Sequence, residues 1–539
     1  MKREAMIVRL RERKEPWDMV VIGGGATGAG VVVDAASRGY SVLLLEREDF
    51  GKGTSSRSTK LVHGGVRYLE QGNVPLVMEA LKERGILLEN APHLVHDLRF
   101  IVPNYSWWEA PFYGIGMKIY DLLAGKYGFG KSKTLSPAET IEQLPTIRQD
   151  GLRGGVIYHD GQFDDSRLLI SLIATAVEQG AVVVNYASVL DLTKDASGFV
   201  DGIVAVDRES NEPFTVAAKV VINATGIFAD EVRRLAEPQA PAMIAPSQGI
   251  HLVFDKSFLP GNTAVMVPHT SDGRVLFAIP WHEHTLVGTT DTPIDAPSYE
   301  PRPFEEEIEF VLETAGQYLS RPPKREDILS VYVGIRPLVK AAGSDIGNTS
   351  ALSRDHTIHI DRAGLLTVAG GKWTTYRLMA EDTVNHAITL AQLEERPCVT
   401  RTLRIHGYQV RERRRNLQTE LDESPEEALA VYGSDGAHIR DLAANDPELA
   451  QRLDPALPYI GAEVVWAVRE EMARTLDDIL ARRTRSLLLN SRAAIRMAPA
   501  AAKLLARELG KDGAWTDTQV QTFRGLAAQY DVHRASGNN

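Results

Sequence analysis

A glycine-rich turn near the N-terminus constrains the fold of this chain more than any other feature of the sequence. The short apolar segment 18–22 stops at a run of glycines, and residues 29–38 have the apolar richness of a packed helix. Gly23 permits a tight turn, Gly25 lets a pyrophosphate approach the backbone, and Gly28 lets the helix pack on the strand. The helix N-terminus then faces the phosphates. The segment therefore predicts a Rossmann-like unit that binds a dinucleotide.

An acidic residue and a polar loop extend this prediction. Residues 41–45 predict a second strand, and Glu46 follows it, eighteen residues beyond Gly28, where a carboxylate accepts hydrogen bonds from ribose hydroxyls. The loop 47–60 has no helical or strand period, and a solvated linker is one interpretation of it. Its small hydroxyl side chains also suit hydrogen bonding along the chain of a cofactor. These side chains are Thr54, Ser55 and Ser58. The glycine motif by itself does not distinguish NAD from FAD.

Composition excludes several classes of protein. A chain of 539 residues is long enough for roughly three domains. It has 60 Lys and Arg against 71 Asp and Glu, so a net charge of −11 disfavours nucleic acid as a partner. The single cysteine, Cys398, excludes disulfide scaffolds and cysteine-rich metal sites. Because no histidine spacing typical of metal ligands occurs either, we predict no metal.

The two ends of the chain differ from its middle. Residues 1–17 carry six basic side chains and predict a solvated N-terminal tail, with an interfacial membrane anchor as the alternative. No apolar run approaches the ~18 residues needed to span a bilayer. From about residue 400 the β-branched runs thin out, which predicts an all-helical C-terminal domain over 400–539. A helical spacing of apolar residues over 462–481 is part of this pattern.

A basic patch near the end of that spacing has two interpretations. It consists of Arg482, Arg483, Arg485 and Arg492. We expect a solvated helical face or a subunit contact there, with a contact to an anionic membrane as the alternative. Between the two ends, residues 150–380 alternate short apolar β-like runs with helical patterns, which predicts an α/β region with a sizeable sheet.

Several blocks along the chain resemble one known family. The glycine turn is followed over residues 54–70 by T-S-S-x-S-x-K-L-x-H-G-G-x-R-Y-L-E. Further blocks follow in the family's order at residues 223–226, 279–281, 288–291, 334–338, 354–355 and 370–377. Over residues 18–535 the chain resembles the FAD-dependent glycerol-3-phosphate dehydrogenases, relatives of the D-amino-acid-oxidase group of flavoproteins.

The resemblance implies a fold and a cofactor. It implies an α/β fold in which an FAD-binding Rossmann-like domain is interleaved within 18–399 with an α+β substrate domain built on a mixed or antiparallel sheet. It implies the same helical domain over 400–539. FAD is then the expected cofactor. The residues expected to bind it are Gly23, Gly25, Gly28, Glu46, Thr54, Ser55, Ser58, Thr225, Gly226 and Gly371.

Cations from separate segments are the expected substrate ligands. A phosphate carries about −1.5 to −2 charges at neutral pH, so a chain of net charge −11 must concentrate guanidinium or ammonium groups to bind it. Candidates in glycine-rich or irregular sequence are Arg67, Arg336, Arg354 and Lys372. An ordinary ion pair remains the alternative for each arginine. The resemblance associates Arg67 and Arg336 with substrate binding and places Lys372 beside the flavin ring.

An alcohol oxidation also needs a proton acceptor. A histidine titrates near neutral pH, so His251, which begins an apolar strand, is the expected general base, although a lone histidine is often structural. We expect catalytic roles for His251, Arg336 and Lys372, and substrate binding by Arg67, Tyr68 and Arg354.

The expected activity is the oxidation of sn-glycerol 3-phosphate to dihydroxyacetone phosphate by hydride transfer to flavin. The resemblance implies a respiratory quinone as electron acceptor, peripheral attachment to the inner, cytoplasmic face of the membrane and, as an alternative acceptor, oxygen. An amine or amino-acid oxidase on the same fold is a rival, and so is a flavin-binding regulatory or RNA-modifying protein. We also consider a homodimer.

Overall fold

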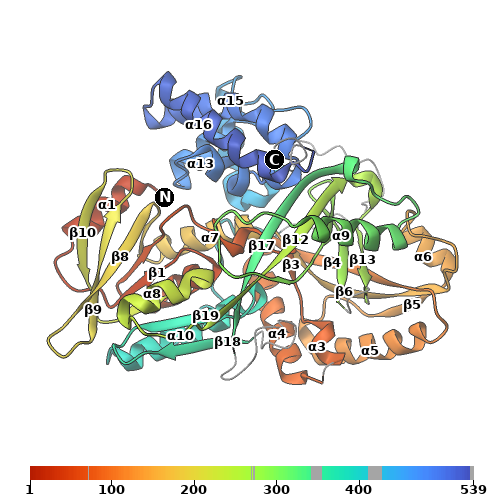
Figure 1. The fold of residues 1–539 in the computed structure, drawn as a ribbon, viewed down its shortest axis with the longest axis horizontal. Helices are drawn as coiled ribbons and strands as arrows, with labels where there is room; N and C mark the ends of the chain where they lie inside the picture. Colours follow the sequence, from red (N-terminus) through yellow and green to blue (C-terminus); the bar gives the residue numbers. More distant parts are fainter. Residues whose placement is uncertain (71, 269, 271–273, 341–354, 411–427, 534–539) are drawn as a thin grey trace.

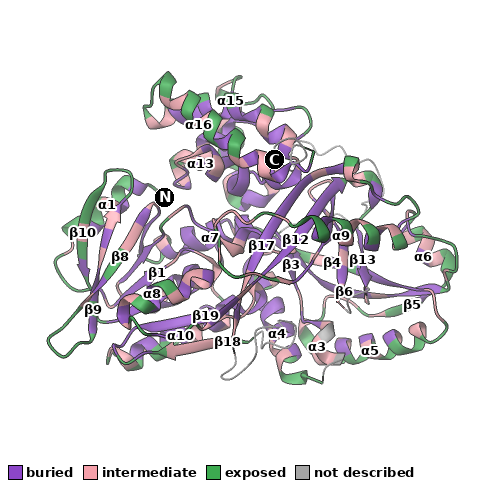
Figure 2. Ribbon diagram, viewed as in Figure 1, coloured by how far each residue is buried: buried purple, intermediate pink, exposed green. Residues whose placement is uncertain are grey.

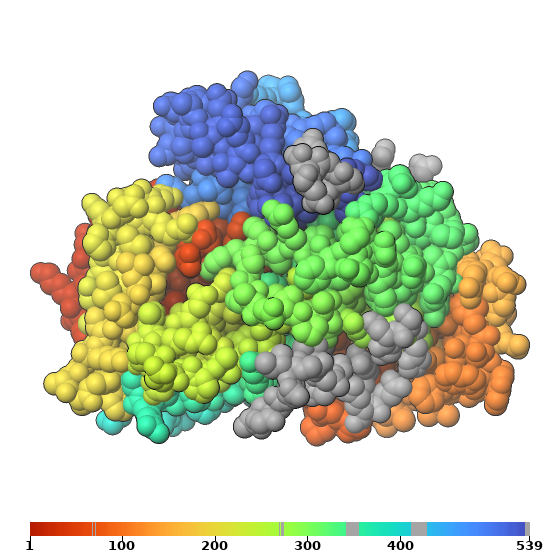
Figure 3. Space-filling model, viewed as in Figure 1, coloured from red at the N-terminus to blue at the C-terminus, as the bar shows by residue number. Residues whose placement is uncertain are grey.

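The computed structural model describes the whole chain except residues 71, 269, 271–273, 341–354, 411–427 and 534–539, and for residues 67 and 70 it gives the backbone alone. Figure 1 shows a sheet that carries the glycine-rich turn in the centre, a second, larger sheet beside it, and a group of helices from the C-terminal part of the chain above both. In the space-filling view these C-terminal helices form a separate lobe over the other two parts (Figure 3).

A mostly parallel sheet carries the glycine-rich turn. In the described part of the chain it has six strands in the order β18-β19-β11-β1-β2-β7, and only β18 runs antiparallel to its neighbour. Four of its strands are buried along their whole length, as expected for a parallel sheet. The strands are β1 (Met19–Ile22), β2 (Val42–Leu45), β7 (Val182–Val184), β11 (Val221–Asn223), β18 (His356–Ile360) and β19 (Leu366–Gly370).

Two further sheets complete the β structure of the described residues. One is a three-stranded antiparallel sheet of β8 (Ala187–Lys194), β9 (Val200–Asp207) and β10 (Glu212–Ala217). The other has ten strands and is antiparallel except between β4 and β13. Its strands are β3 (Leu61–Val62), β4 (Val95–Asn104), β5 (Lys133–Leu135), β6 (Gly154–Phe163), β12 (Ile244–Asp255), β13 (Thr263–Val267), β14 (Leu276–Trp281), β15 (His284–Gly288), β16 (Thr292–Pro293) and β17 (Ile328–Val339).

Helices cover both large sheets and make up the lobe at the C-terminus. The helices before residue 400 are α1 (Arg3–Glu12), α2 (Ala26–Ser37), α3 (Val66–Glu70), α4 (Val74–Asn90), α5 (Glu109–Ala124), α6 (Pro137–Gln143), α7 (Asp165–Glu178), α8 (Ala229–Ala236), α9 (Glu305–Tyr318) and α10 (Tyr376–Leu390). Those after it are α12 (Gly436–Asn445), α13 (Gly461–Glu470), α14 (Ser486–Leu489), α15 (Ser491–Leu509) and α16 (Gly513–Ala527). None of the helices in the described residues is long and apolar enough to cross a membrane.

These elements confirm the predicted fold class. A Rossmann-like sheet, a mixed sheet of mainly antiparallel pairs and a helical C-terminal region are all present. The strands of the larger sheet come from segments on both sides of β7 and β11, so the two sheets are interleaved in sequence. The domain limits at residues 17 and 399 stay predictions.

The N-terminal segment is not the solvated tail that we expected. Residues 3–12 form α1, which packs against β7. Met6 and Leu10 are buried, and the guanidinium of Arg3 is buried against Asp207 at 2.7 Å. The terminal amine of Met1 donates to the carbonyl of Glu470 at 2.7 Å. The basic residues of this segment suggested a solvated tail. The sequence does not show that they have partners, because those partners lie far away along the chain.

The basic patch at residues 482–492 is also corrected by the structure. Arg482, Arg483 and Arg485 are at most 2% exposed, so they form neither a solvated face nor a surface for an anionic membrane. Arg482 and Arg483 both pair with Asp49, which lies just after β2, and Arg485 pairs with Asp164 at the start of α7. The patch therefore attaches the C-terminal lobe to the rest of the protein.

The helical spacing over residues 462–481 does not form one continuous helix. Helix α13 ends at Glu470, and Met472 has a positive φ of 56°. A single turn of π-helix over Asp478–Arg483 follows. The end of α13 and the π-helical turn change the direction of the chain, so that Arg482 and Arg483 point into the protein.

Candidate active site

A cavity of about 490 Å³ opens where the glycine-rich turn joins α2. Gly25 is the N-cap of α2 and has no side chain to occupy the helix N-terminus. Gly23 has a φ of 107°, in the region that favours glycine. A Cβ atom on Gly28 would lie 1.9 Å from the carbonyl oxygen of Gly23, so only glycine allows the helix to pack this closely. Gly23 and Gly25 line the cavity, while Gly28 brings helix and strand together behind it.

Glu46 lies on the wall of the same cavity, at the end of β2. Its carboxylate accepts hydrogen bonds from the backbone N–H groups of Gly24, at 2.6 Å, and Glu48, at 2.8 Å. Burial raises the pKa of Glu46 to about 7. The carboxylate is held in place beside the phosphate-binding turn, in the position that suits ribose hydroxyls.

Only some of the hydroxyl side chains in the polar loop after Glu46 line the cavity. Thr54 and Ser55 line the cavity, and Ser55 Oγ accepts a hydrogen bond from the N–H of Ala26, in the first turn of α2, at 2.9 Å. Ser58 does not line it, because its hydroxyl donates to the buried carboxylate of Asp165 at 2.7 Å. Thr225, Gly226 and Gly371 also line the cavity. The residues expected along the cofactor therefore come together around one cavity, with Ser58 behind it.

A second cavity of about 680 Å³ lies between the larger sheet and helices α3 and α4. Tyr68 lines it, and the ring of Tyr68 is 4.0 Å from Nζ of Lys372, which lines the first cavity. This contact places the two cavities next to each other. The site thus has a compartment for a dinucleotide and an adjoining compartment for a substrate.

Arg336 reaches the second cavity from β17. Its guanidinium donates to the carbonyl oxygen of Thr290 at 3.0 Å and to the carboxylate of Asp291 at 3.2 Å. The hydroxyl of Ser247 also donates to Asp291. Arg336 therefore takes part in an ion pair, as the alternative interpretation had it, and at the same time remains on the cavity wall, with 23% of its side chain exposed.

His251 lies on β12, beneath this wall. It is 3% exposed, and its ring stacks on Tyr332 with 4.8 Å between ring centroids. Nε2 lies 2.9 Å from the hydroxyl oxygen of Thr59, and Thr59 lines the second cavity. Burial, followed by the charges of Lys60 and Arg336, holds the pKa of His251 well below its usual value. The imidazole is therefore neutral, and it is separated from the cavity by the Thr59 hydroxyl.

The structure does not describe the side chains of two predicted substrate-binding residues. Arg354 lies outside the described residues. Arg67 lies in α3, next to Tyr68, and the structure gives its backbone alone.

Sequence reasoning missed other residues of the second cavity. Thr59, Arg274 and Asp291 line it, and none was assigned a role. Asp291 belongs to the quoted block 288–291, so that block was a usable signal. Arg274 precedes a β-like run and carries no motif, so nothing in the sequence alone separated it from a surface arginine.

Comparisons with known proteins agree with this geometry. A family model described as "FAD dependent oxidoreductase" matches residues 18–377. A second model, described as "C-terminal domain of alpha-glycerophosphate oxidase", matches residues 398–519. Glycine oxidase from Geobacillus kaustophilus shares the fold with a TM-score of 0.51 at 21% identity, over 71% of this chain and 96% of that one. The cavities and the match together define an FAD-dependent oxidoreductase of the D-amino-acid-oxidase fold, and FAD is its cofactor.

Relatives with higher sequence identity show which family of FAD-dependent oxidoreductases the chain belongs to. The chain is 40% identical to the mitochondrial glycerol-3-phosphate dehydrogenases of Bos taurus and Homo sapiens, over 97% of its own length and 74% of theirs. The X-ray structure of the glycerol-3-phosphate dehydrogenase from Bacillus halodurans complexed with FAD matches with a TM-score of 0.77 at 30% identity, over 98% of this chain and 97% of that one. The chain belongs to the FAD-dependent glycerol-3-phosphate dehydrogenase family.

Proposed function

We propose that this protein oxidises sn-glycerol 3-phosphate to dihydroxyacetone phosphate and passes the electrons to a quinone in the membrane. The contact between Lys372 and Tyr68 carries the proposal, because it joins the FAD cavity to a second cavity that holds cationic side chains. When bound, FAD supplies the hydride acceptor. The names of the most similar relatives support the choice of substrate.

The phosphate of the substrate binds to arginines at the second cavity. Arg336 and Arg274 both line it, in a protein whose net charge is −11. Asp291 and Thr290 fix the guanidinium of Arg336, so little side-chain freedom is lost when the phosphate arrives. We include Arg67 and Arg354 in this group as proposed ligands.

Lys372 and Tyr68 orient the substrate between the two cavities. Lys372 lines the flavin side and Tyr68 the substrate side. An ammonium beside the reacting carbon favours the negative charge that develops on the substrate oxygen.

His251 accepts the hydroxyl proton of the substrate through Thr59. The Thr59 hydroxyl contacts the cavity and lies 2.9 Å from Nε2, so it can take a proton from the substrate while it gives its own to the imidazole. Because burial keeps the imidazole neutral, it is ready to accept this proton down to acidic pH.

Anaerobic reduction of the bound flavin tests the function. We expect glycerol 3-phosphate to bleach the visible absorbance of the holoenzyme, and glycerol and a D-amino acid to leave it unchanged. Arg336→Ala should raise the substrate concentration for half-maximal bleaching by about ten- to a hundredfold, because a charge-assisted hydrogen bond contributes about 1.5–3 kcal/mol. Bleaching by the amino acid alone would reject the proposed substrate in favour of the amino-acid oxidase.

The electron acceptor needs its own measurement. Turnover with glycerol 3-phosphate is followed in the presence of a quinone, of oxygen, or of both. We expect the quinone to support turnover and hydrogen peroxide formation to be slow. Rapid peroxide formation without any effect of quinone would make the protein an oxidase instead. A quinone acceptor requires contact with a membrane, and the inner, cytoplasmic face is the location that the family resemblance implies.

A further inference from the structure

Lys60 is a buried cation that the proposed mechanism does not use. It lies in the block 54–70, just before β3, and its side chain is fully buried. The ammonium group donates to the carbonyl of Ser56 at 2.7 Å and to both carboxylate oxygens of Asp165, the first residue of α7, at 2.8 Å. Asp165 is also fully buried. A buried ion pair contributes little net stability, because both charges are removed from water. Stability alone is therefore a weak explanation for this pair.

The ion pair fixes the backbone on both sides of Thr59. The N–H and the hydroxyl of Ser58 donate to Asp165 at 3.1 and 2.7 Å, and the N–H of Lys60 donates to the hydroxyl of Ser58 at 3.0 Å. Lys60 has a φ of 63°, which a residue with a side chain adopts only where its surroundings hold it. Between these two residues, Thr59 lines the second cavity and contacts Nε2 of His251. The pair therefore holds the hydroxyl through which the proton passes.

Lys60 also packs on the aromatic ring that supports His251. Nζ of Lys60 lies 5.1 Å from the centre of the Tyr332 ring and 4.9 Å from that of Trp281. Tyr332 is opposite His251 in the register of β12 and β17, and its ring stacks on the imidazole. The hydroxyl of Tyr332 donates to the carbonyl of Ser58 at 2.9 Å. Figure 2 shows β12 and β17 buried along most of their length. The ammonium and the imidazole thus pack on one ring in the interior of the protein.

The other neighbour of His251 is a glycine. A Cβ atom on Gly288, which pairs with His251 between β15 and β12, would lie 2.3 Å from Cδ2 of the imidazole. Tyr332 and the backbone of β15 therefore fix the position of the ring. In the part of the chain that the structure describes, Nδ1 of His251 has no hydrogen-bond partner. A proton on Nδ1 would have no acceptor there.

The charged groups that act on the imidazole are cations. They are Lys60, held by Asp165, and Arg336 of β17, held by Asp291. Burial, followed by the charges of Lys60 and Arg336, holds the pKa of His251 well below its usual value. Burial also lowers the pKa of Lys60, and Asp165 acts in the opposite direction. Because an imidazolium would face two like charges, the neutral ring is favoured.

We propose that the buried Lys60–Asp165 pair positions the proton path of the reaction, by fixing Thr59 and Tyr332 around His251 and by placing a positive charge beside the imidazole. This charge sets the lower pH limit of the reaction, because it disfavours protonation of the imidazole from solvent. Neither member of the pair lines a cavity, so both are positioning residues. The inference rests on the proposed function, since it requires His251 to accept the proton of the substrate.

The pH dependence of flavin reduction tests the proposal. The rate of anaerobic bleaching of the holoenzyme is measured with saturating glycerol 3-phosphate over a range of pH. Lys60→Met combined with Asp165→Asn removes both charges and leaves an amide oxygen to accept from Ser58. Loss of the cation raises the pKa of His251, so the midpoint of the acid limb should move up by about one pH unit. The substrate concentration for half-maximal bleaching should change less than about threefold, because neither residue lines the substrate cavity.

Two control variants separate charge from folding. Lys60→Arg keeps the positive charge and should leave the acid limb where it is in the unchanged protein. The matched control removes a buried ion pair of α2, between Arg38 and Asp34 at 2.6 Å. Arg38→Met combined with Asp34→Asn should lower stability without moving the acid limb. FAD content and thermal unfolding report folding for all variants.

NMR of the holoenzyme with ¹³C-labelled histidine measures His251 directly. The signal of His251 is assigned by its loss in His251→Gln. We expect His251 to stay neutral in the unchanged protein down to at least about pH 5.5, and to titrate about one pH unit higher in the Lys60→Met, Asp165→Asn variant. The first expectation needs only the unchanged protein, so it holds as a test even if the double variant does not fold.

Three results would overturn the proposal. They are the same acid limb in the double variant and the unchanged protein, an equal shift in the Arg38 and Asp34 control, and a His251 signal that titrates near pH 6.5 in the unchanged protein. Failure of the proposed function is distinguishable from these. The unchanged protein would then not be bleached by glycerol 3-phosphate, or His251→Gln would be bleached as fast as the unchanged protein.

Discussion

Glu46 combines two requirements that oppose each other. Its carboxylate has to be ionised to bind ribose well, yet burial without FAD raises its pKa to about 7. A carboxyl group whose pKa is higher in the folded than in the unfolded protein favours folding below its ordinary pKa, and this contribution is lost as pH rises towards the folded value. In the FAD-free protein, stability should therefore fall between about pH 4.5 and about pH 7 because of this residue.

The variant Glu46→Gln separates the two effects. It should make the FAD-free protein more stable than the unchanged protein at pH 8 by about 1–3 kcal/mol, with little difference at pH 4.5. It should at the same time weaken FAD binding about tenfold, because the ribose loses a charged acceptor. Thermal unfolding at several pH values and titration with FAD measure the two effects. A Glu46→Gln protein that is less stable than the unchanged protein at every pH would contradict the argument.

Thr59 should act through its hydroxyl group. Thr59→Val keeps the shape of the side chain but removes the link between the cavity and His251, so kcat should fall by about a hundredfold or more with KM nearly unchanged. Thr59→Ser restores the hydroxyl and should recover most of kcat. Steady-state kinetics of both variants, with FAD content as the control for folding, decides this. Equal activity of the valine and serine variants would exclude a proton path through Thr59.

The sequence predicted local residues of the site better than distant ones. Gly23, Gly25 and Glu46 belong to one contiguous motif whose spacing is set by a strand, a turn and a helix, so their positions around the cavity could be predicted. Ser58 lies only three residues beyond Ser55, but Asp165, more than a hundred residues away, binds its hydroxyl. No local pattern could indicate that contact.

At the scale of elements, the burial of the arginines before α14 also depends on residues far away in sequence. A run of arginines on a helical pattern predicts a solvent-exposed helix face, because arginine is seldom buried without a partner. Here the partners of Arg482 and Arg483 lie beside β2, and the π-helical turn directs both toward Asp49. Their burial depends on the packing of two distant parts of the chain, which periodicity does not reveal.

The turn Asp478–Arg483 should hold the loop that lines the FAD cavity. Asp49 is fully buried and accepts from Arg482 at 2.6 Å and from Arg483 at 2.8 Å. Lys52, three residues further on, lines the cavity and pairs with Asp477. Asp49→Asn leaves two buried cations undercompensated, so it should lower the free energy of unfolding by about 3–5 kcal/mol and weaken FAD retention.

A surface ion pair provides the control for Asp49→Asn. Arg469 is half exposed where it contacts Glu508, so Arg469→Ala should change the free energy of unfolding by less than about 1 kcal/mol and leave FAD retention unchanged. Denaturant titration and the rate of FAD loss on dilution measure both variants. If Asp49→Asn destabilised the protein no more than Arg469→Ala, the buried cluster would have no special role.

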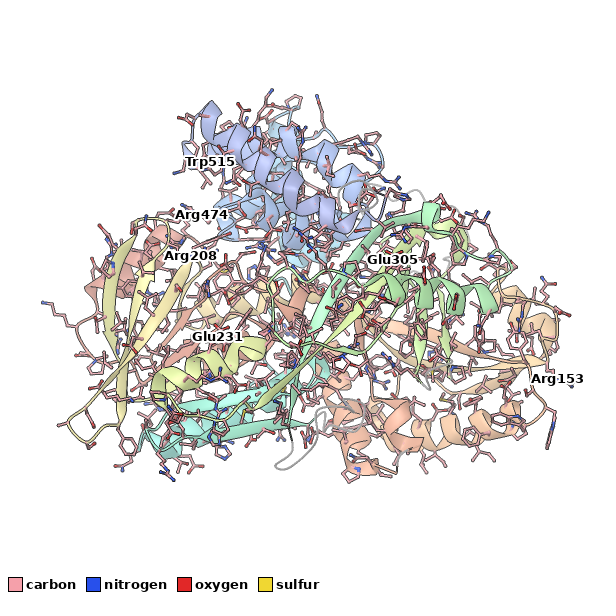
Figure 4. All side chains as sticks on the ribbon, viewed as in Figure 1. Arg153, Arg208, Glu231, Glu305, Arg474 and Trp515 are labelled. Atoms are coloured by element: carbon pink, nitrogen blue, oxygen red, sulfur yellow. The ribbon has the colours of Figure 1, made fainter. Side chains whose placement is uncertain are left out.

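At the scale of the whole molecule, ion pairs link the C-terminal lobe to several other parts of the protein. Arg474 lies where this lobe meets the three-stranded sheet (Figure 4), and it contacts Glu209, which follows β9, at 2.7 Å. Arg167 of α7 contacts Glu471 at 2.6 Å. The neighbouring arginines hold the pKa of Asp49 and Glu471 below their ordinary values in spite of burial. The stability that these carboxylates contribute is present above their ordinary pKa and is lost as pH falls, so acid should loosen the lobe.

His406 gives the lobe a second, opposite dependence on pH. Its ring lies between Glu178 of α7, at 2.5 Å, and Asp435, just before α12, at 2.7 Å. Burial lowers its pKa, but the hydrogen bonds and charges of these two carboxylates outweigh it and raise the pKa to about 9. A histidine whose pKa is raised in the folded protein contributes stability that is complete below about pH 6.5 and lost as pH rises through about 9.

His406→Gln should therefore lower the free energy of unfolding by about 1–2 kcal/mol at pH 6, and by much less at pH 9.5. Denaturant titration at both pH values measures this, and His386, which is exposed on α10, supplies the control variant His386→Gln. A loss that is equal at pH 6 and pH 9.5 would mean that His406 acts by packing and not by its charge.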